Sequence, residues 1–311
     1  MTTLSISKSD TGPSLDPPAG AENSAARSGP RALVGRQPIL DRALNVVGYE
    51  LLFRPSTEEA AAPFDGNRAT AQVILNTIAE IGLDNVVNGR PAFINFTDEH
   101  LISGTAQLLP QQQVVIEVLE DAVVNDELID ALTVLVNAGY TLALDDFVYD
   151  SKWDCLLEIA STVKIDILAS SSEEIRSIVE RSKSLNVKLL AEKVETQEQF
   201  DEMFELGFEL FQAYFFAKPK VISHAILPPN HISLLRFLAT LQDKEATADE
   251  IEGLVSQDAS LSYKLLRCIN SAHFALPQKI DSIRRAVVYF GLDLLRRWAC
   301  LLAMANIVKR H

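Results

Sequence analysis

Hydrophobic and polar residues along residues 32 to 220 form a pattern that predicts strands and helices in turn. Eight short apolar runs predict strands: ALVGRQPI, NVVGYELLF, PAFINF, VVIEVL, TLALDDF, TVKIDI, VKLLAE and FELFQAYFF. Between them, amphipathic helices are predicted at RATAQVILNTIAEIG, NDELIDALTVLVNAG, SSEEIRSIVERSKSL and TQEQFDEMFELG. This alternation predicts an α/β fold with a mostly parallel sheet. The number of strands suits a TIM-like (β/α)8 barrel better than an open sheet, although periodicity alone does not separate the two.

The segments on either side of this region have different patterns. Residues 1–30 are rich in Ser, Pro, Gly and Ala and contain almost no large apolar side chains, which predicts a disordered tail. Three prolines in KPKVISHAILPPNH (218–231) mark a boundary, and the pattern beyond it is wholly helical. We therefore expect a tail over 1–30, a barrel over 31–220 and part of an all-α domain over 221–311.

Composition narrows the possible functions. The net charge of −14 disfavours nonspecific nucleic-acid binding and repels a phosphate-bearing ligand unless local cations reverse the field. The three cysteines are widely spaced and form no CxxC, so neither a disulfide framework nor a zinc site is predicted. The sequence has no apolar run of about 18 residues and no secretory signal pattern, so we expect a cytoplasmic protein that does not cross a membrane.

Polar residues with metal-binding chemistry follow the predicted strands in series. In a parallel barrel the carboxyl ends of the strands meet at one mouth, where reactive residues lie. These positions are Glu50, Asn95, Glu117, Asp145 with Asp146, Lys164, Glu192 with Glu195, and Gln212. Converging oxygen ligands suit Mg²⁺ or Mn²⁺ better than zinc, and two such ions could hold a bridging hydroxide and polarise a phosphodiester.

Each of these residues alone has an ordinary explanation. An Asp or Glu after a strand most often caps a helix or lies in a solvated loop, and Lys164 alone would be read as a surface lysine. The recurrence of such residues at successive strand ends is what indicates a site.

These segments resemble the EAL domain, the bacterial cyclic di-GMP phosphodiesterase. The Glu-Ala-Leu signature is similar to Glu50-Leu51-Leu52, FINFT to the family's FIN strand, IEVLE to LEITE and AEKVET to AEGVET. LALDDF, VKID and FQAYFFAKP are similar to its double-Asp, lysine and QGYxFSKP segments. The resemblance implies metal ligands at Glu50, Asn95, Glu117, Asp145 and Asp146.

The resemblance also implies roles for residues that do not bind metal. It places Arg54 against a substrate phosphate and Lys164 against the nucleophilic water. It makes Glu192 the general base, with Glu195 steadying the loop near the metals and Gln212 near the water or the base.

The sequence departs from the family in one loop. Where the family has DDFGTGYSSL, this chain has DDFVYDSKWDCL, and the segment from Asp145 to Lys164 is shorter. Leu51 replaces the signature Ala, and Lys193 replaces a Gly. In active members this loop helps to bind metal and couples dimerisation to catalysis, so these departures put catalysis in doubt more than ligand or metal binding.

From about residue 224 the chain resembles the front part of the HDOD domain, a helical relative of HD phosphohydrolases without their metal motif. The segment with this resemblance is DASLSYKLLRCINSAHFALPQKIDSIRRAVVYFGLDLLRRW. The order of an EAL-like segment followed by an HDOD-like one, together with the opening GRQPILDRALNVVGYELLFR, resembles the EAL-HDOD signalling proteins of the YuxH type. It implies partner proteins that bind the HDOD helices, and a homodimer.

Two hypotheses of different classes follow. The first is slow, metal-dependent hydrolysis of cyclic di-GMP to pGpG. The second is a catalytically silent receptor for cyclic di-GMP, or a protein-interaction scaffold, that acts through the HDOD helices. An unrelated TIM-barrel metal enzyme fits the fold but does not explain the ordered motifs.

Overall fold

The computed structural model describes most of the chain from residue 31 onward. The described residues are 31–55, 64–213, 219–226, 230–243, 246–271 and 278–306. The disordered tail predicted over residues 1–30 lies outside them.

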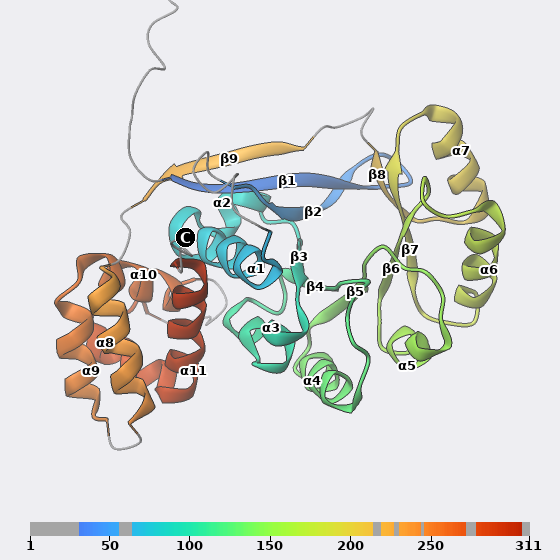
Figure 1. Cartoon of the computed structure of the whole chain (residues 1–311). Helices are drawn as coiled ribbons and strands as arrows, with labels where there is room; N and C mark the ends of the chain where they lie inside the picture. The colour runs from blue at the N-terminus through green and yellow to red at the C-terminus, as the bar shows by residue number, and fades with distance from the viewer. Residues whose placement is uncertain are drawn as a thin grey trace, which may run out of the picture.

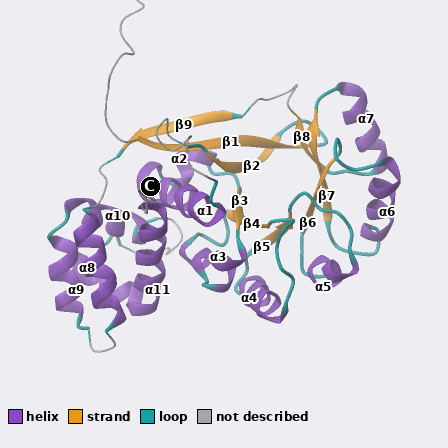
Figure 2. Ribbon diagram, in the orientation of Figure 1, coloured by secondary structure: helices purple, strands orange, loops and turns teal. Residues whose placement is uncertain are grey.

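Eight strands close into a barrel with helices around it (Figure 1, Figure 2). Their bounds are β1 Arg31–Asp41, β2 Val46–Phe53, β3 Ala92–Phe96, β4 Val114–Val118, β5 Thr141–Leu144, β6 Thr162–Asp166, β7 Lys188–Val194 and β8 Leu210–Ala213. The strands are ordered β2-β3-β4-β5-β6-β7-β8-β1, and β1 also pairs with β2, which closes the circuit. The predicted barrel is confirmed, and each predicted strand segment forms a strand.

β1 runs antiparallel to both of its barrel neighbours, β2 and β8, while the other barrel pairs are parallel. Only residues 42–45 connect β1 to β2, and a parallel pair would need a crossover of about a dozen residues. The Asp41 carboxylate accepts hydrogen bonds from the backbone N–H groups of Ala43 and Asn45, at 2.9 and 2.8 Å, and so stabilises this tight turn. The sheet is mostly parallel, as predicted, and its first strand enters through a hairpin.

A ninth strand lies within the segment predicted as a boundary. β9 (Lys220–Ala225) pairs antiparallel with β1, in a register that runs from Arg31 facing Ala225 to Arg36 facing Lys220. β9 therefore pairs with the first half of β1, whereas β8 pairs with its last two residues, before the chain turns to helices.

The longer helices around the barrel have the predicted amphipathic character and begin at side-chain N-caps. They are α1 Gly66–Leu75, α2 Leu83–Val87, α3 Asp98–Ile102, α4 Asp126–Asn137, α5 Asp154–Leu157, α6 Ser172–Ser182 and α7 Gln197–Leu206, with a π-helical turn η2 Asn76–Ile81 and 3-10 turns η3 Thr105–Leu108 and η4 Ser151–Trp153. Capping boxes start α6 (Ser171 with Glu174) and α7 (Thr196 with Gln199), satisfying backbone N–H groups that have no partner inside the helix.

The barrel interior has an apolar layer beneath a polar one. A separate buried cluster consists of Ile39, Phe93, Val115, Ala143 and Leu190. Because side chains two residues apart on a strand point the same way, the residues two positions after the last four also face the interior. Those residues are Asn95, Glu117, Asp145 and Glu192. The strand period thus places the polar residues at the carboxyl end of the barrel, above an apolar floor.

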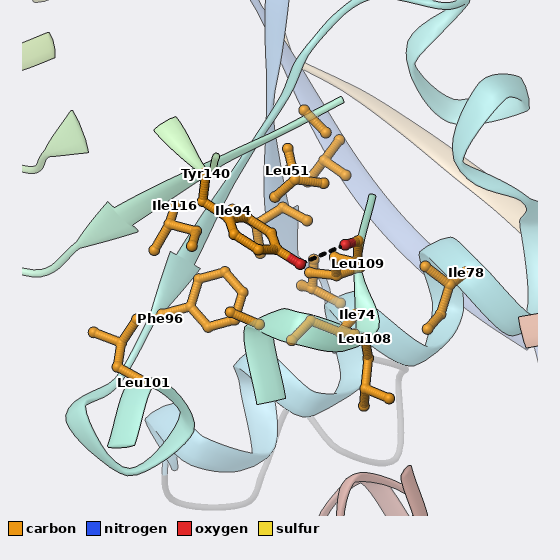
Figure 3. Close-up of a cluster of buried hydrophobic side chains, with 14 of the residues drawn as sticks. Leu51, Ile74, Ile78, Ile94, Phe96, Leu101, Leu108, Leu109, Ile116 and Tyr140 are labelled. Atoms are coloured by element: carbon orange, nitrogen blue, oxygen red, sulfur yellow. Dashed lines mark hydrogen bonds between the residues drawn. The ribbon is translucent and has the colours of Figure 1, made fainter. Parts of the chain in front are cut away.

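Alternate side chains on the same strands pack outward against the helices. Figure 3 shows part of this layer, in which Ile94, Phe96 and Ile116 lie among side chains of the surrounding helices. The buried Tyr140 hydroxyl donates a hydrogen bond of 2.8 Å to the Leu109 carbonyl, so its polar end is satisfied within the core.

A helical unit follows the barrel and packs beside α1 (Figure 1). It consists of α8 His231–Gln242, α9 Ala248–Ser256, α10 Ala259–Ile269 and α11 Ile283–Asn306, the last interrupted at Gly291, where φ is +70°. Phe237 and the fully buried Trp298 make an edge-to-face contact at its centre, with ring centroids 6.0 Å apart. No helix in the described part of the chain has an apolar stretch long enough to span a bilayer.

Polar contacts join this unit to the barrel. Lys264 of α10 forms an ion pair with Glu80 of η2, and both side chains are buried. Arg267 donates a hydrogen bond of 2.6 Å to the Glu80 carbonyl, and Arg297 of α11 donates one of 3.4 Å to the Gly104 carbonyl. The junction is therefore specific as well as apolar.

Candidate metal centre at the barrel mouth

Four strands bring carboxylates to the same end of the barrel. Glu50 comes from β2, Glu117 from β4, Asp145 from the residue after β5, and Glu192 from β7. One oxygen each from Glu50, Glu117 and Asp145 lies within 4.8 Å of the others. We call these four residues the inner cluster.

A fully buried lysine lies at the centre of the inner cluster. The Lys164 Nζ is 2.6 Å from Asp145 Oδ1, 2.7 Å from Glu117 Oε1, 3.1 Å from Glu192 Oε1 and 3.6 Å from Glu50 Oε2. One ammonium thus faces four carboxyl groups that have little or no contact with water. A site with this charge ratio is short of positive charge.

Two amide side chains hold Glu50 in place. The Asn95 Nδ2 donates a hydrogen bond of 3.1 Å to Glu50 Oε1, and the Gln212 Nε2 donates one of 2.6 Å to Glu50 Oε2. Gln212 is itself buried, so its orientation is defined by the surrounding core. Both predicted amides therefore lie in the site.

The protonation of the inner cluster reflects its burial. Burial raises the pKa of Glu117 well above its usual value, although the nearby Lys164 opposes this effect. Burial also raises the pKa of Glu192 to about 8. For Lys164, burial would lower the pKa, but the surrounding carboxylates together raise it well above the usual value. The lysine therefore stays charged, and the carboxyl groups bind either protons or a further cation.

The oxygens of the site fit a hard divalent cation. Besides Glu117 Oε1 and Asp145 Oδ1, which face the Lys164 ammonium, four buried oxygens of the site accept no hydrogen bond from any residue that the structure describes: Glu117 Oε2, Glu192 Oε2, Asn95 Oδ1 and Asp146 Oδ1. Buried polar atoms are rarely left without a partner, and carboxylate and amide oxygens are the ligands that Mg²⁺, Mn²⁺ and Ca²⁺ prefer. The donor set contains no sulfur or imidazole and so does not suit zinc.

A second pair of carboxylates, one half-buried and one buried, lies beside the inner cluster. We call Asp146 and Asp166 the outer pair. Lys193 forms an ion pair with Asp166 Oδ2, and its Nζ is 4.0 Å from Asp146 Oδ1. The other Asp166 oxygen accepts the backbone N–H groups of Leu168 and Ala169, at 2.8 and 3.1 Å. Although burial opposes it, hydrogen bonding to Lys193 and to this backbone lowers the pKa of Asp166, so this carboxylate is charged.

Two predicted site residues belong to neither group of carboxylates and lie apart from both. Glu195 is exposed, and its backbone N–H donates a hydrogen bond of 2.8 Å to Gln199 Oε1 at the start of α7. Arg54 is half-buried, donates a hydrogen bond of 2.8 Å to the Phe53 carbonyl and packs so closely over Gly35 that a side chain there would collide with it. Among the described residues, neither side chain contacts the inner cluster.

Two buried polar residues near the site, Asp166 and Gln37, were not predicted from the sequence. Asp166 ends the same strand as Lys164, two positions later, so its place on the same face was readable from TVKID. Gln37 is buried opposite Glu50 in the β1–β2 register, and the available signal was its position two residues before Ile39, on the face of the strand that points into the barrel.

The chain matches two family models in succession. The EAL domain model matches residues 36–219, and the HDOD domain model matches residues 227–311. The order agrees with the resemblance inferred from the motifs.

Two curated relatives match over most of this chain. The first is "Uncharacterized protein YuxH" of Bacillus subtilis, 34% identical over 285 residues, which cover 90% of this chain and 70% of the relative. The second is "Cyclic di-GMP phosphodiesterase CdgJ" of Vibrio cholerae, 37% identical over 278 residues, which cover 88% of this chain and 64% of the relative. The chain therefore spans less than two thirds of CdgJ.

Solved structures of BlrP1 from Klebsiella pneumoniae are similar to the barrel. A complex with calcium and cy-diGMP at pH 8.0 has a TM-score of 0.51 and 25% identity, covering 62% of this chain and 58% of BlrP1. A complex with manganese and cy-diGMP at pH 6 has a TM-score of 0.50 and 25% identity, covering 67% and 62%. Because the EAL domain model matches more than half of the chain, the chain belongs to the EAL domain family, and an HDOD domain follows its EAL domain.

Proposed function

We propose that this chain hydrolyses cyclic di-GMP to linear pGpG in a reaction that requires two Mg²⁺ or Mn²⁺ ions. The observation that carries the proposal is the inner cluster, in which four carboxyl groups converge on one buried lysine. Membership of the EAL family, the activity for which CdgJ is named and the cy-diGMP complexes of BlrP1 support the same substrate.

The residues proposed to hold the cations are Glu50, Asn95, Glu117, Asp145 and Asp146. When bound, a divalent cation supplies positive charge that polarises the phosphodiester and makes a bound water more acidic. The Gln212 side chain donates a hydrogen bond of 2.6 Å to the Glu50 carboxylate and holds it in place, so Glu50 does not have to change its orientation to bind a cation.

Glu192 is proposed as the general base. Burial raises its pKa to about 8, which suits a group that must take a proton from water near neutral pH. Lys164 lies 3.1 Å from Glu192 Oε1 and donates hydrogen bonds, so it can orient a water between the base and the phosphorus atom. The water oxygen bonds to phosphorus as Glu192 takes its proton, the bond from phosphorus to the 3′ oxygen breaks, and that oxygen takes up a proton to give the 3′ hydroxyl of pGpG. Arg54 is proposed to contact the substrate phosphate, and Glu195 to steady the neighbouring loop.

The test is hydrolysis by the purified chain with Mg²⁺ or Mn²⁺, with pGpG detected by chromatography. Wild type and the surface variant Lys183→Ala should give product, and Glu192→Gln should lose activity by about 100-fold or more while still binding cyclic di-GMP. The absence of product from wild type, with an active EAL enzyme turning over in the same assay, would contradict the proposal.

The second candidate is a receptor that binds cyclic di-GMP without hydrolysis. It is favoured by the altered segment after Asp146, in which Phe147 packs edge-on against Trp153 and the Arg181 guanidinium lies 3.7 Å from the Tyr149 ring centre. Calorimetry that gives nucleotide binding without turnover would support it. HDOD-binding partner proteins and a homodimer stay predictions under either function.

A further inference from the structure

Lys193 has a backbone conformation that is unusual for its residue type. Its φ is +56°, in the left-handed region that favours glycine, and the β7–β8 register breaks between Ala191 and Val194. The backbone therefore bends at the residue directly after Glu192. Such outliers persist where surrounding contacts hold them, and here the contacts are made by the lysine side chain.

The Lys193 ammonium lies between the two carboxylates of the outer pair. It forms an ion pair with Asp166 and lies 4.0 Å from Asp146 Oδ1, a buried oxygen that accepts no hydrogen bond from the described residues. Asp146 is also one of the proposed cation ligands. Lys193 thus already neutralises part of the negative charge that would attract a cation to Asp146.

We propose that Lys193 is a built-in counter-ion that weakens the binding of the second divalent cation. The chain then holds one cation tightly at Glu50, Glu117 and Asp145, and a second, at Asp146, only at higher concentration. The inference rests on the proposed function, since it assigns unequal affinities to the two cations of that site.

Coulomb repulsion supplies the physical reason. An ammonium about 4 Å from a ligand oxygen repels an approaching dication by enough to lower its affinity about tenfold or more, even at a high effective dielectric constant. The Lys193 side chain is 44% exposed, so it can swing into solvent. It therefore competes with the second cation and does not block it.

The experiment is calorimetric titration of the full chain with Mn²⁺ at fixed ionic strength. Wild type should bind one equivalent tightly and a second at least about tenfold more weakly. Lys193→Gln, which removes the charge, and Lys193→Gly, which also relieves the positive φ, should each tighten the second equivalent about tenfold or more. Lys193→Arg keeps the charge and should behave as wild type.

Further variants identify the ligand and separate the two proposals. Asp146→Asn in the Lys193→Gln background should remove the tightened equivalent and leave the first. Two equal equivalents in wild type, or a Lys193→Gln titration identical to wild type, would overturn the role of Lys193 and leave the proposed hydrolysis standing. If no variant binds Mn²⁺, both the role of Lys193 and the proposed hydrolysis are overturned. If the titrations agree with the prediction but the protein does not hydrolyse cyclic di-GMP, only the proposed hydrolysis is overturned.

Discussion

Two buried lysines of this protein differ in the number of carboxyl groups that surround them. Lys164, at the barrel mouth, contacts four carboxyl groups, whereas Lys264, at the junction with the helical unit, is paired with the single carboxylate of Glu80. Both side chains are almost fully buried, at 0% and 2% exposed. Burial of a charged group alone therefore does not indicate a functional site.

The ratio of charges separates the two lysines. A one-to-one pair is close to neutral and needs nothing further, so the Lys264–Glu80 pair is explained by docking α10 against the barrel. The inner cluster has an excess of negative charge that its own lysine does not balance, and burial shifts the pKa values of Glu117 and Glu192 upward. Such an imbalance is stable only with protons or cations present, and that requirement makes the barrel mouth a candidate site.

The largest expected effect comes from removing each lysine in turn. Lys264→Met should lower the free energy of unfolding by about 3–5 kcal/mol, because it leaves Glu80 buried without its partner. Lys164→Met should cost a similar amount or more in metal-free protein, since several carboxylates lose their counter-charge. Chemical denaturation at pH 8, with chelator and with Mn²⁺, measures both.

Added Mn²⁺ should affect the stability of the two lysine variants differently. Mn²⁺ should restore most of the stability of Lys164→Met, because a cation supplies the missing charge there, and should restore none of the loss in Lys264→Met. The double variant Glu80→Gln with Lys264→Met should be more stable than Lys264→Met alone. Equal rescue of the two lysine variants by Mn²⁺ would remove the distinction between the two regions.

A smaller effect is expected from pH in the metal-free wild type. The folded-state pKa of Glu192 is raised from 4.5 to about 8, so the folded protein binds this proton more tightly than the unfolded chain does. Stability from this group is therefore present below about pH 4.5 and is lost as pH rises towards 8, by up to about 1.4 kcal/mol per pH unit. Scanning calorimetry should find a larger gain in Tm from Mn²⁺ at pH 8 than at pH 6. An equal or smaller gain at pH 8 would contradict the assignment.

The smallest effect is expected at an exposed ion pair on α6. Lys183 and Glu180 are 64% and 73% exposed, with 2.5 Å between Nζ and Oε2. Lys183→Ala should change the free energy of unfolding by about 0.5 kcal/mol or less, with no dependence on Mn²⁺. A loss as large as that of Lys264→Met would show that burial does not explain the difference between these lysines.

Local sequence was enough to predict most of the barrel and most of its mouth. Strand segments were readable because their apolar runs are short and bounded by turn residues. Asn95, Glu117 and Lys164 were predictable as site residues because each lies near the carboxyl end of a strand, and these ends meet at one mouth of a barrel. Local pattern did not reveal that β1 is antiparallel or that β9 extends the sheet.

The side chains that alternate into the barrel interior follow from the order of amino acids alone, because the two-residue period of a strand is a local property. Tertiary structure alone decided which charges meet: Lys164 with four carboxylates, Lys264 with Glu80, and Lys193 with Asp146 and Asp166. The physical reason is range, because residues far apart along the chain come within a few ångströms only after the sheet has closed. Glu195 and Arg54 lie in matching motifs, yet the closed sheet leaves their side chains away from the inner cluster.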